Sequence, residues 1–254
     1  MNNLTNLSRY ACQNVRLVAT DFDGTVTEKA QLSAEAIAAL SKLQQFGIAV
    51  VMVTGRSTGW VHGLRHYLPI AGAIAENGGL YNSQPDTPPD ILVSLPSLPQ
   101  HRQNLAQVFQ TLKIAFPHLK EATDNSFRFT DWTFDVAGLS DADLRQLKQQ
   151  CQKQGYSFTY SSVQCHIKPQ GQDKATALKT VLSKYFPDLK PEQVLTIGDS
   201  PNDESLFNPD LFPLSVGVAN IQEYSEQLNH KPQYITEARE GKGFCELANC
   251  LLKN

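Results

Sequence analysis

Residues 15–25 read VRLVATDFDGT, and this stretch decides the fold. The apolar run VRLVAT is typical of a short strand buried on both faces, as in a parallel sheet. It ends abruptly at Asp21 and Asp23, whose side chains point the same way if the chain stays extended. Two such carboxylates repel each other unless a cation or a proton lies between them. Gly24 permits the tight turn that lets the Asp23 side chain face back toward Asp21. The stretch therefore predicts a buried strand ending at a site for a hard cation such as Mg²⁺; the alternative is an ordinary Asp-Gly turn.

Strand-like and helix-like segments alternate on both sides of this stretch. Ser33 is a predicted N-cap and Gly47 a predicted helix-ending residue, and the apolar positions between them have helical spacing. The order strand, helix, strand predicts an α/β fold with a parallel sheet and crossover helices. The predicted helices cover 33–46, 58–68, 174–185 and 244–252, and the predicted strands cover 15–20, 48–53, 71–75, 193–197 and 214–218.

The middle of the chain has a different pattern and predicts an inserted α+β block. A segment rich in proline, aspartate and serine over 83–95 is typical of a linker or an edge segment. The predicted elements that follow are a helix over 100–116, antiparallel strands over 126–137, a helix over 140–154 with Ser140 as N-cap, and one or two strands over 157–167. We therefore expect a catalytic core formed by residues 1–82 and 168–254, and an inserted domain formed by residues 83–167.

Composition limits the classes of protein that the chain can be. Its 254 residues carry a net charge of −3, so nothing calls for nucleic acid or an anionic membrane as partner. No apolar run approaches the roughly 18 residues of a membrane span, and residues 1–14 form a polar tail without the apolar region of a secretory signal. The five cysteines are scattered, which favours reduced thiols and a cytoplasmic location.

Two further motifs carry groups suited to phosphate. Thr54 follows the second strand in VTGR, where a hydroxyl and backbone N–H groups at a helix start can hold phosphate oxygens; on this motif alone a simple helix cap is the better interpretation. Lys174 opens a helix, and its ammonium group can neutralise both a phosphate and an attacking carboxylate. A solvated lysine is the alternative, and Lys168 competes for the same role.

The last motif, GDSPNDESL, follows the strand QVLTI. Asp199 and Asp203 could complete an oxygen-rich magnesium site, and Asn202 offers one more ligand or hydrogen-bond donor. A turn that caps the following helix is the alternative. Because ligands of open parallel sheets bind at the carboxyl ends of the strands, four such motifs together predict one phosphate site there.

These motifs, in this order, resemble the haloacid dehalogenase superfamily: DFDGT at 21–25, VTGR with Thr54, Lys174 before a helix, and GDSPND at 198–203. The position of the insert resembles subfamily IIB, which has a Rossmann-like core with an inserted α+β cap of the C2 type. That group includes Cof-like sugar phosphatases, sucrose-phosphate phosphatase and mannosyl-3-phosphoglycerate phosphatase. The segment ENGG at 76–79 also looks like that of this group.

The resemblance implies a role for each matching residue. It implies Asp21 as nucleophile and metal ligand, and Asp23 as general acid and base with its backbone carbonyl on the metal. It further implies that Thr54 and Lys174 hold the phosphoryl group, that Asp199 binds Mg²⁺ as cofactor, and that Asn202 and Asp203 support phosphate or metal. An aspartate at position 23 favours phosphatases over dehalogenases in this superfamily.

Residues that contact the rest of the substrate are harder to predict. Gly55, Arg56 and Asn77 lie close to the predicted site, and Arg128 in the cap could clamp a second anionic group. Further cap candidates are Asp131, Trp132, Asp135 and His166. The alternative is that the cap aromatics form its core and that its charged residues form a solvated sheet face.

The chain is thus predicted to hydrolyse a small-molecule phosphate monoester through an aspartyl-phosphate, with a sugar phosphate or a phosphoglycerate derivative as the leading substrate class. The alternatives are a phosphomutase-like isomerase and a non-catalytic protein that binds a phosphorylated metabolite. We expect a monomer or a small homo-oligomer, since the cap can cover the site without a partner.

Overall fold

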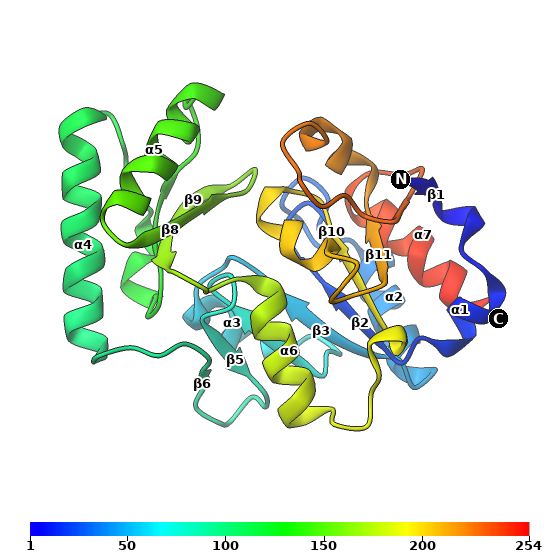
Figure 1. Cartoon of the computed structure of the whole chain (residues 1–254). Coiled ribbons are helices and arrows are strands. Elements are labelled where there is room, and N and C mark those ends of the chain that lie inside the picture. The colour runs from blue at the N-terminus through cyan, green and yellow to red at the C-terminus, as the bar shows by residue number, and fades with distance from the viewer. Residues whose placement is uncertain (254) are drawn as a thin grey trace.

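A mostly parallel sheet runs through the larger part of the molecule (Figure 1). The computed structural model describes residues 1–253, and within them this sheet has nine strands. All neighbouring pairs are parallel except those made by the last two strands. In sheet order the strands are β1 (Asn2–Asn3), β12 (Tyr234–Ile235), β11 (Leu214–Gly217), β10 (Val194–Gly198), β2 (Leu17–Thr20), β3 (Ala49–Val53), β4 (Gly72–Ala75), β5 (Leu80–Asn82) and β6 (Asp90–Ile91).

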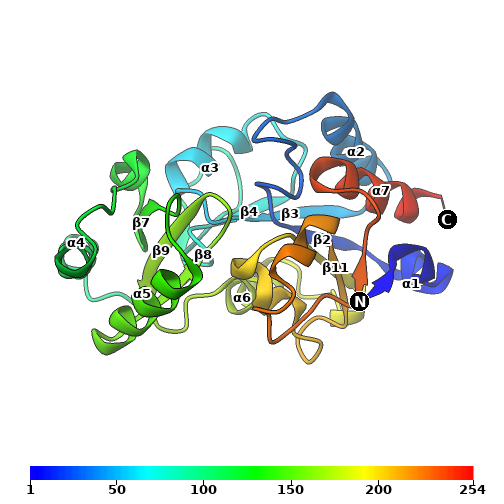
Figure 2. The same ribbon diagram turned by 90° about the horizontal axis from the view of Figure 1, so that it is seen from above.

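Helices cover both faces of this sheet, which is why its central strands are almost completely buried and mostly apolar. On one face lie α1 (Arg9–Asn14), α2 (Ala34–Gln45), α3 (Thr58–Arg65) and α7 (Glu240–Leu252), and on the other lies α6 (Lys174–Tyr185) (Figure 2). Each face of the sheet has its own hydrophobic core, and successive β2 residues alternate between them. Val18 packs in the core beneath α1, α2, α3 and α7, whereas Leu17 and Ala19 pack in the core beneath α6.

A second, three-stranded antiparallel sheet forms the part that we call the cap (Figure 1, left). Its order is β7 (Trp132–Asp135), β9 (Gln164–Pro169) and β8 (Tyr156–Tyr160), and it packs with α4 (Leu98–Ala115) and α5 (Asp141–Lys153) around a core of its own. The predicted α/β core with a small inserted α+β unit is therefore confirmed. The predicted division at residues 83 and 167 stays a prediction, and β6 beyond position 82 still pairs with the large sheet.

Local signals explain where several helices begin and end. The Ser33 side chain accepts a hydrogen bond from the backbone N–H of Ala36 (3.1 Å), and Gly47 has a φ of +75° after α2, as predicted. Ser140 and Asp143 form a reciprocal capping box at the start of α5. Short 3₁₀ helices connect the other elements: η1 (Leu4–Asn6), η2 (Thr123–Phe127), η3 (Pro191–Gln193), η4 (Pro201–Phe207) and η5 (Ala219–Tyr224).

Three predictions of local structure were wrong. Residues 126–137 were expected to form antiparallel strands, but only the second half is β7, because the backbone N–H groups of Phe129 and Thr130 bind the carboxylate of Glu76 instead of a sheet neighbour. Residues 1–14 are not a simple tail: they form β1, η1 and α1, which bury Leu4 and Cys12. The last helix begins at residue 240, four residues earlier than expected.

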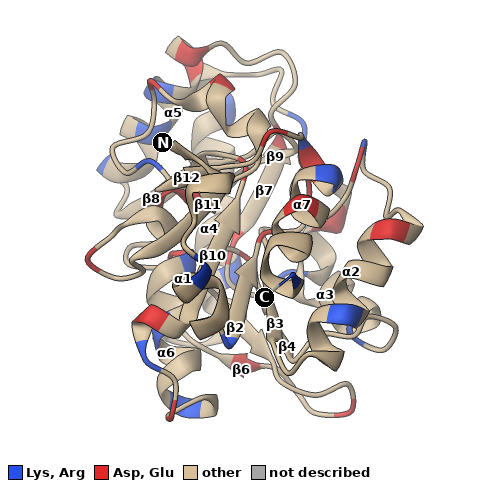
Figure 3. Ribbon diagram, turned by 90° about the vertical axis from the view of Figure 1, so that its right-hand side faces the viewer, with Lys and Arg blue, Asp and Glu red and all other residues tan. Residues whose placement is uncertain are grey.

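Surface features agree with an ordinary globular protein. Along the ribbon in Figure 3, acidic and basic residues are interspersed. Within residues 1–253, none of the helices has the length and apolar character that a membrane crossing needs. None of the five cysteines forms a disulfide within this part of the chain.

Candidate active site

Three aspartates converge where β2 and β10 end side by side. The strands pair in parallel, so the residues that follow them, Asp21 and Asp199, meet at the same edge of the sheet. Asp203 reaches the same point from η4. Carboxylate oxygens of these three buried residues all lie within 4.8 Å of one another. The sequence motifs that supply them are thus brought together as expected.

Lys174, the first residue of α6, lies between two of these carboxylates. Its fully buried Nζ donates to Oδ1 of Asp21 and to Oδ1 of Asp203, both at 2.6 Å. Burial alone would lower the pKa of this ammonium group, but the charges of the two aspartates outweigh burial and raise it. The competing Lys168 donates instead to the carbonyl oxygen of Gln172.

The single positive charge of Lys174 does not balance the three aspartates of the cluster. Burial, opposed by Lys174 and reinforced by Asp203, raises the pKa of Asp21 to about 7. Burial and the neighbouring carboxylates also raise the pKa of Asp199 well above its ordinary value. Asn220 donates to Oδ2 of Asp199 (2.8 Å), while Oδ1 is buried without a hydrogen-bond donor. A cluster of oxygen atoms with an unpaired acceptor and excess negative charge fits a hard divalent cation such as Mg²⁺.

The Asp23 carboxylate is not part of this cluster. It accepts two hydrogen bonds from Arg56, from Nε at 2.8 Å and from Nη2 at 2.7 Å. The guanidinium carbon of Arg56 also lies 5.5 Å from the ring centre of Trp60. Asp23 therefore contributes no side-chain oxygen to the acidic cluster, and the metal contact predicted for its backbone carbonyl stays a prediction.

The loop after β3 lies beside the acidic cluster. Thr54 Oγ1 accepts the backbone N–H of Arg56 (3.1 Å). Asn202 donates its amide to Oδ1 of Asn77 (3.0 Å), and Nδ2 of Asn77 is buried without a partner. Gly55 leaves little space for a side chain, because a Cβ there would lie 3.1 Å from Nδ2 of Asn77 and equally close to the ring of His166. The loop is thus closely covered by the cap.

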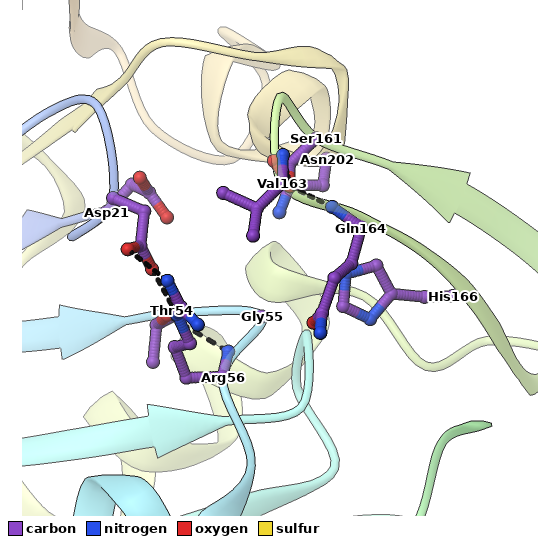
Figure 4. Close-up of a pocket in the computed structure, with 10 residues that line it drawn as sticks. Asp21, Thr54, Gly55, Arg56, Ser161, Val163, Gln164, His166 and Asn202 are labelled. Atoms are coloured by element: carbon purple, nitrogen blue, oxygen red, sulfur yellow. Dashed lines mark hydrogen bonds and ion pairs between the residues drawn. The ribbon is translucent and has the colours of Figure 1, made fainter. Parts of the chain in front are cut away.

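A small cavity of about 20 Å³ lies between the core and the cap. Figure 4 shows the core residues Asp21, Thr54 and Arg56 on one side of the cavity and the cap residues Gln164 and His166 on the other. One water needs about 10–15 Å³ by this kind of measure, so the cavity as it stands admits little more than that. The full lining is Asp21, Asp23, Thr54, Gly55, Arg56, Ser161, Val163, Gln164, His166 and Asn202.

Arg128, expected to clamp a second anionic group, is not part of this lining. Its buried guanidinium donates to Asp131, Asp124 and Gln164 within the cap, and to the carbonyl oxygen of Gly55 in the core (2.9 Å). In this arrangement it joins cap and core rather than facing the cavity.

Sequence reasoning missed two residues that support the site. Asn220 holds Asp199 and also donates to the carbonyl oxygen of Gly24 (3.1 Å). Glu76 is fully buried and accepts hydrogen bonds from the backbone N–H groups of Thr58 and Thr130. The available signal for Glu76 was its position directly after the apolar run 71–75, in the ENGG segment. No signal in the sequence pointed to Asn220.

The sequence of this chain is similar to those of known phosphatases. Residues 14–249 match the family described as sucrose-6F-phosphate phosphohydrolase. Phosphoglycolate phosphatase 1 of Saccharolobus solfataricus is 30% identical over 248 residues, which cover 94% of this chain and 96% of that relative. A phosphoglycolate phosphatase of Thermoplasma volcanium is 28% identical over 200 residues, covering 78% and 83%.

Solved structures share the fold over nearly the whole chain. A protein of Thermoplasma acidophilum superposes with a TM-score of 0.75 at 21% identity, covering 93% of this chain and 98% of that one. A subclass IIB sugar phosphatase of the haloacid dehalogenase superfamily superposes with a TM-score of 0.68 at 12% identity, covering 92% and 98%. The chain belongs to the sucrose-6F-phosphate phosphohydrolase family of the haloacid dehalogenase superfamily and is a phosphoric monoester hydrolase.

Proposed function

We propose that the protein hydrolyses a small phosphate monoester in a Mg²⁺-dependent reaction, with Asp21 as the nucleophile. The observation that carries this proposal is the position of Asp21. Its carboxylate lines the cavity, is held by Lys174 at 2.6 Å, and lies in a cluster with Asp199 and Asp203. An anionic nucleophile next to a fixed cation is the arrangement that attack on a negatively charged phosphoryl group requires.

Asp21 and Asp199 are the residues that would hold the metal. Asp203 would act mainly by positioning, since Oδ1 accepts from Lys174 and Oδ2 accepts the backbone N–H groups of Asp199 (2.9 Å) and Ser200 (3.2 Å). Bound Mg²⁺ would neutralise phosphoryl charge and orient the group for in-line attack.

The proposed reaction has two steps. In the first, an Asp21 oxygen bonds to phosphorus, the bond from phosphorus to the ester oxygen breaks, and Asp23 gives a proton to the departing oxygen. In the second, water attacks phosphorus, the bond to Asp21 breaks, and Asp23 takes the proton of that water. Thr54 and Lys174 would hold the phosphoryl oxygens, and the amide of Asn202 would lie at the edge of the same site.

Asp23 can act in this way only after its pairing with Arg56 is released. The cavity is also too small for a phosphate ester as it stands. Substrate entry would therefore require the cap to move outward and Arg56 to turn away from Asp23, which would free Arg56 for the substrate. Water exclusion after closure would protect the first step.

The substrate class that we propose is a sugar phosphate or a phosphoglycerate derivative. One feature supports a polar leaving group: most residues that line the cavity, from both core and cap, have polar side chains. The names of the family and of the relatives point to phosphorylated sugars and to phosphoglycolate, respectively.

The test is phosphate release from a panel of phosphorylated metabolites, with Mg²⁺ and with EDTA. The panel includes hexose phosphates, sucrose phosphate, glycosyl phosphoglycerates, phosphoglycolate and nucleotides. We expect metal-dependent release with a clear preference, and loss of turnover in Asp21→Asn with an unchanged circular dichroism spectrum. Turnover that persists in EDTA or in Asp21→Asn would overturn the proposal.

A further inference from the structure

His166 is a cap residue that lies against the loop after β3 of the core. It belongs to β9, where it pairs with Thr133 of β7, so its position is set by the cap sheet. Its side chain is 2% exposed and lines the cavity. A Cβ added to Gly55 would lie 3.2 Å from Nε2 of His166, which shows that this nitrogen faces the loop next to Thr54.

The other ring nitrogen of His166 is held by a buried carboxylate. Nδ1 lies 2.8 Å from Oδ2 of Asp131, which is fully buried. Burial opposes the ionisation of Asp131, but the charge of Arg128 and the hydrogen bond from His166 outweigh it and lower its pKa. Arg128 donates to both oxygens of Asp131, at 2.9 and 3.1 Å. Asp131 is therefore an ionised group that only accepts hydrogen bonds.

This arrangement fixes the tautomer of the imidazole. Since Asp131 only accepts, the proton of the ring must lie on Nδ1. Burial, partly opposed by Asp131, lowers the pKa of His166, so the ring is neutral at neutral pH. A neutral imidazole with its proton on Nδ1 has a lone pair on Nε2. The cavity wall thus contains a fixed acceptor.

No described residue donates to that lone pair. The neighbouring polar groups of the wall are already engaged with the protein. Gln164 accepts from Arg128 (3.0 Å) and donates to Asp124 (3.4 Å). Asn202 accepts from Ser200 Oγ (2.8 Å) and donates to Asn77. His166 Nε2 is thus an acceptor in the described cavity wall that no protein donor occupies, and it is available to a ligand.

We propose that His166, positioned by Asp131, is a specificity-determining residue that accepts a hydrogen bond from a hydroxyl group of the substrate's leaving group. A lone pair facing the cavity attracts an O–H donor and repels a carboxylate or phosphate oxygen. This inference rests on the proposed function and narrows it. The preferred substrates are phosphate esters of polyols or sugars, and an ester whose leaving group has only a carboxylate, such as phosphoglycolate, is a poorer substrate.

The experiment compares two esters with the same three-carbon skeleton, glycerol phosphate and propyl phosphate, each with Mg²⁺. We expect the wild type to have a kcat/KM for glycerol phosphate roughly ten-fold or more above that for propyl phosphate, because the second ester leaves the acceptor unpaired. In His166→Leu the preference should fall to within about three-fold, since the acceptor is gone. His166→Gln, which keeps an acceptor oxygen, should retain part of it.

The possible outcomes distinguish the role of His166 from the proposed hydrolysis itself. A purely structural role of His166 would lower kcat/KM for both esters alike, and that result would overturn its assignment. Hydrolysis of both esters by the wild type without a preference, or a preference for phosphoglycolate over glycerol phosphate, would overturn it while the proposed function stands. Release of phosphate from none of these esters would overturn the assignment of His166, and release from no member of the wider panel either would overturn the proposed function as well.

A second measurement checks the tautomer without any turnover. Nitrogen NMR of histidine-labelled protein should show that His166 carries its proton on Nδ1, with Nε2 unprotonated. Addition of glycerol phosphate to Asp21→Asn should shift the Nε2 resonance, and propyl phosphate should not. A proton on Nε2 in the free protein would contradict the proposal.

Discussion

At the scale of single residues, the charge balance of the site depends on Lys174. It is fully buried between Asp21 and Asp203, so its removal leaves two buried carboxylates without a counter-charge. We predict that Lys174→Met lowers the free energy of unfolding in EDTA by about 3–5 kcal/mol, as measured by urea denaturation. Lys184→Met is the control: Lys184 pairs with Asp90 at the surface, and its loss should barely change stability. Equal effects of the two substitutions would contradict this account.

The raised pKa of Glu76 predicts that the stability of the fold depends on pH. Burial, the largest cause, raises its pKa to about 7. The folded protein then keeps a proton that the unfolded chain releases near pH 4.5. The resulting stability is present below about pH 4.5 and is lost as the pH rises through about 7.

The measurement is urea denaturation in EDTA between pH 5 and 8, for the wild type and Glu76→Gln. Asp21, whose pKa is also raised to about 7, adds to the fall in wild-type stability and remains in the variant. We expect a shallower fall in Glu76→Gln, because a glutamine does not titrate. The same slope for both proteins would show that Glu76 does not hold a proton in the folded state.

The residues of the site were predictable where strand ends determine them. Asp21, Thr54 and Asp199 follow strands whose apolar character is plain in the sequence, and parallel neighbours end at one edge. The pairing of Asp23 with Arg56 could not be predicted, because it depends on side-chain conformations across a loop. The contact of His166 with Asp131 depends on how the cap folds, which the sequence pattern left open.

At the scale of elements, the turn between β4 and β5 joins the core to the cap. Glu76 and Asn77 have positive φ angles of 54° and 51°, and Gly78 has one of 102°. The carboxylate of Glu76 accepts the backbone N–H of Thr130 (2.6 Å) and its hydroxyl (2.8 Å). This short turn therefore anchors the segment that leads into β7.

Gly79 in this turn has no room for a side chain. A Cβ there would overlap Oγ1 of Thr130 at 1.8 Å. We predict that Gly79→Ala lowers the free energy of unfolding by about 1–3 kcal/mol, measured by urea denaturation. Gly63→Ala in α3 is the control, because no atom lies within 4 Å of its added Cβ, and it should be neutral or stabilise by up to about 1 kcal/mol. A neutral Gly79→Ala would contradict the close contact between turn and cap.

The bounds of elements with strong periodic signals were predicted to within a few residues. For α6, the predicted first and last residues are those of the structure. The error at residues 126–137 has a physical cause. Phe127 and Phe129 alternate with polar residues as in a strand, yet both are exposed, and the backbone of this segment is bound by Glu76 of a distant loop. An interaction of that range leaves no local pattern.

At the scale of the whole molecule, metal binding should couple to stability. A divalent cation at Asp21 and Asp199 must displace the protons that their raised pKa values retain. We predict that saturating Mg²⁺, at about 100 times its Kd, raises Tm by roughly 5–10 °C at pH 8 and by less at pH 5.5. Thermal denaturation with Mg²⁺ and with EDTA measures this shift. Asp199→Asn should lose most of it, and an undiminished shift in that variant would place the metal elsewhere.

Core and cap together complete the cavity within one chain. The core contributes the acidic cluster and the phosphate loop, and the cap contributes His166 and the turn at residues 161–164. We therefore expect a monomer to be sufficient for activity, with entry of substrate controlled by the separation of cap and core. Because both parts line the cavity, the chemistry should depend on the core and the choice of substrate on the cap.

The most direct test of the central claim is to trap the covalent intermediate. The protein is mixed with Mg²⁺ and p-nitrophenyl phosphate, turnover is stopped with acid, and the peptide that contains Asp21 is analysed by mass spectrometry. We predict a mass increase of one phosphoryl group on Asp21, absent in EDTA and in Asp21→Asn. Metal-dependent turnover with a phosphoryl group on another residue, or with full activity in Asp21→Asn, would contradict the account.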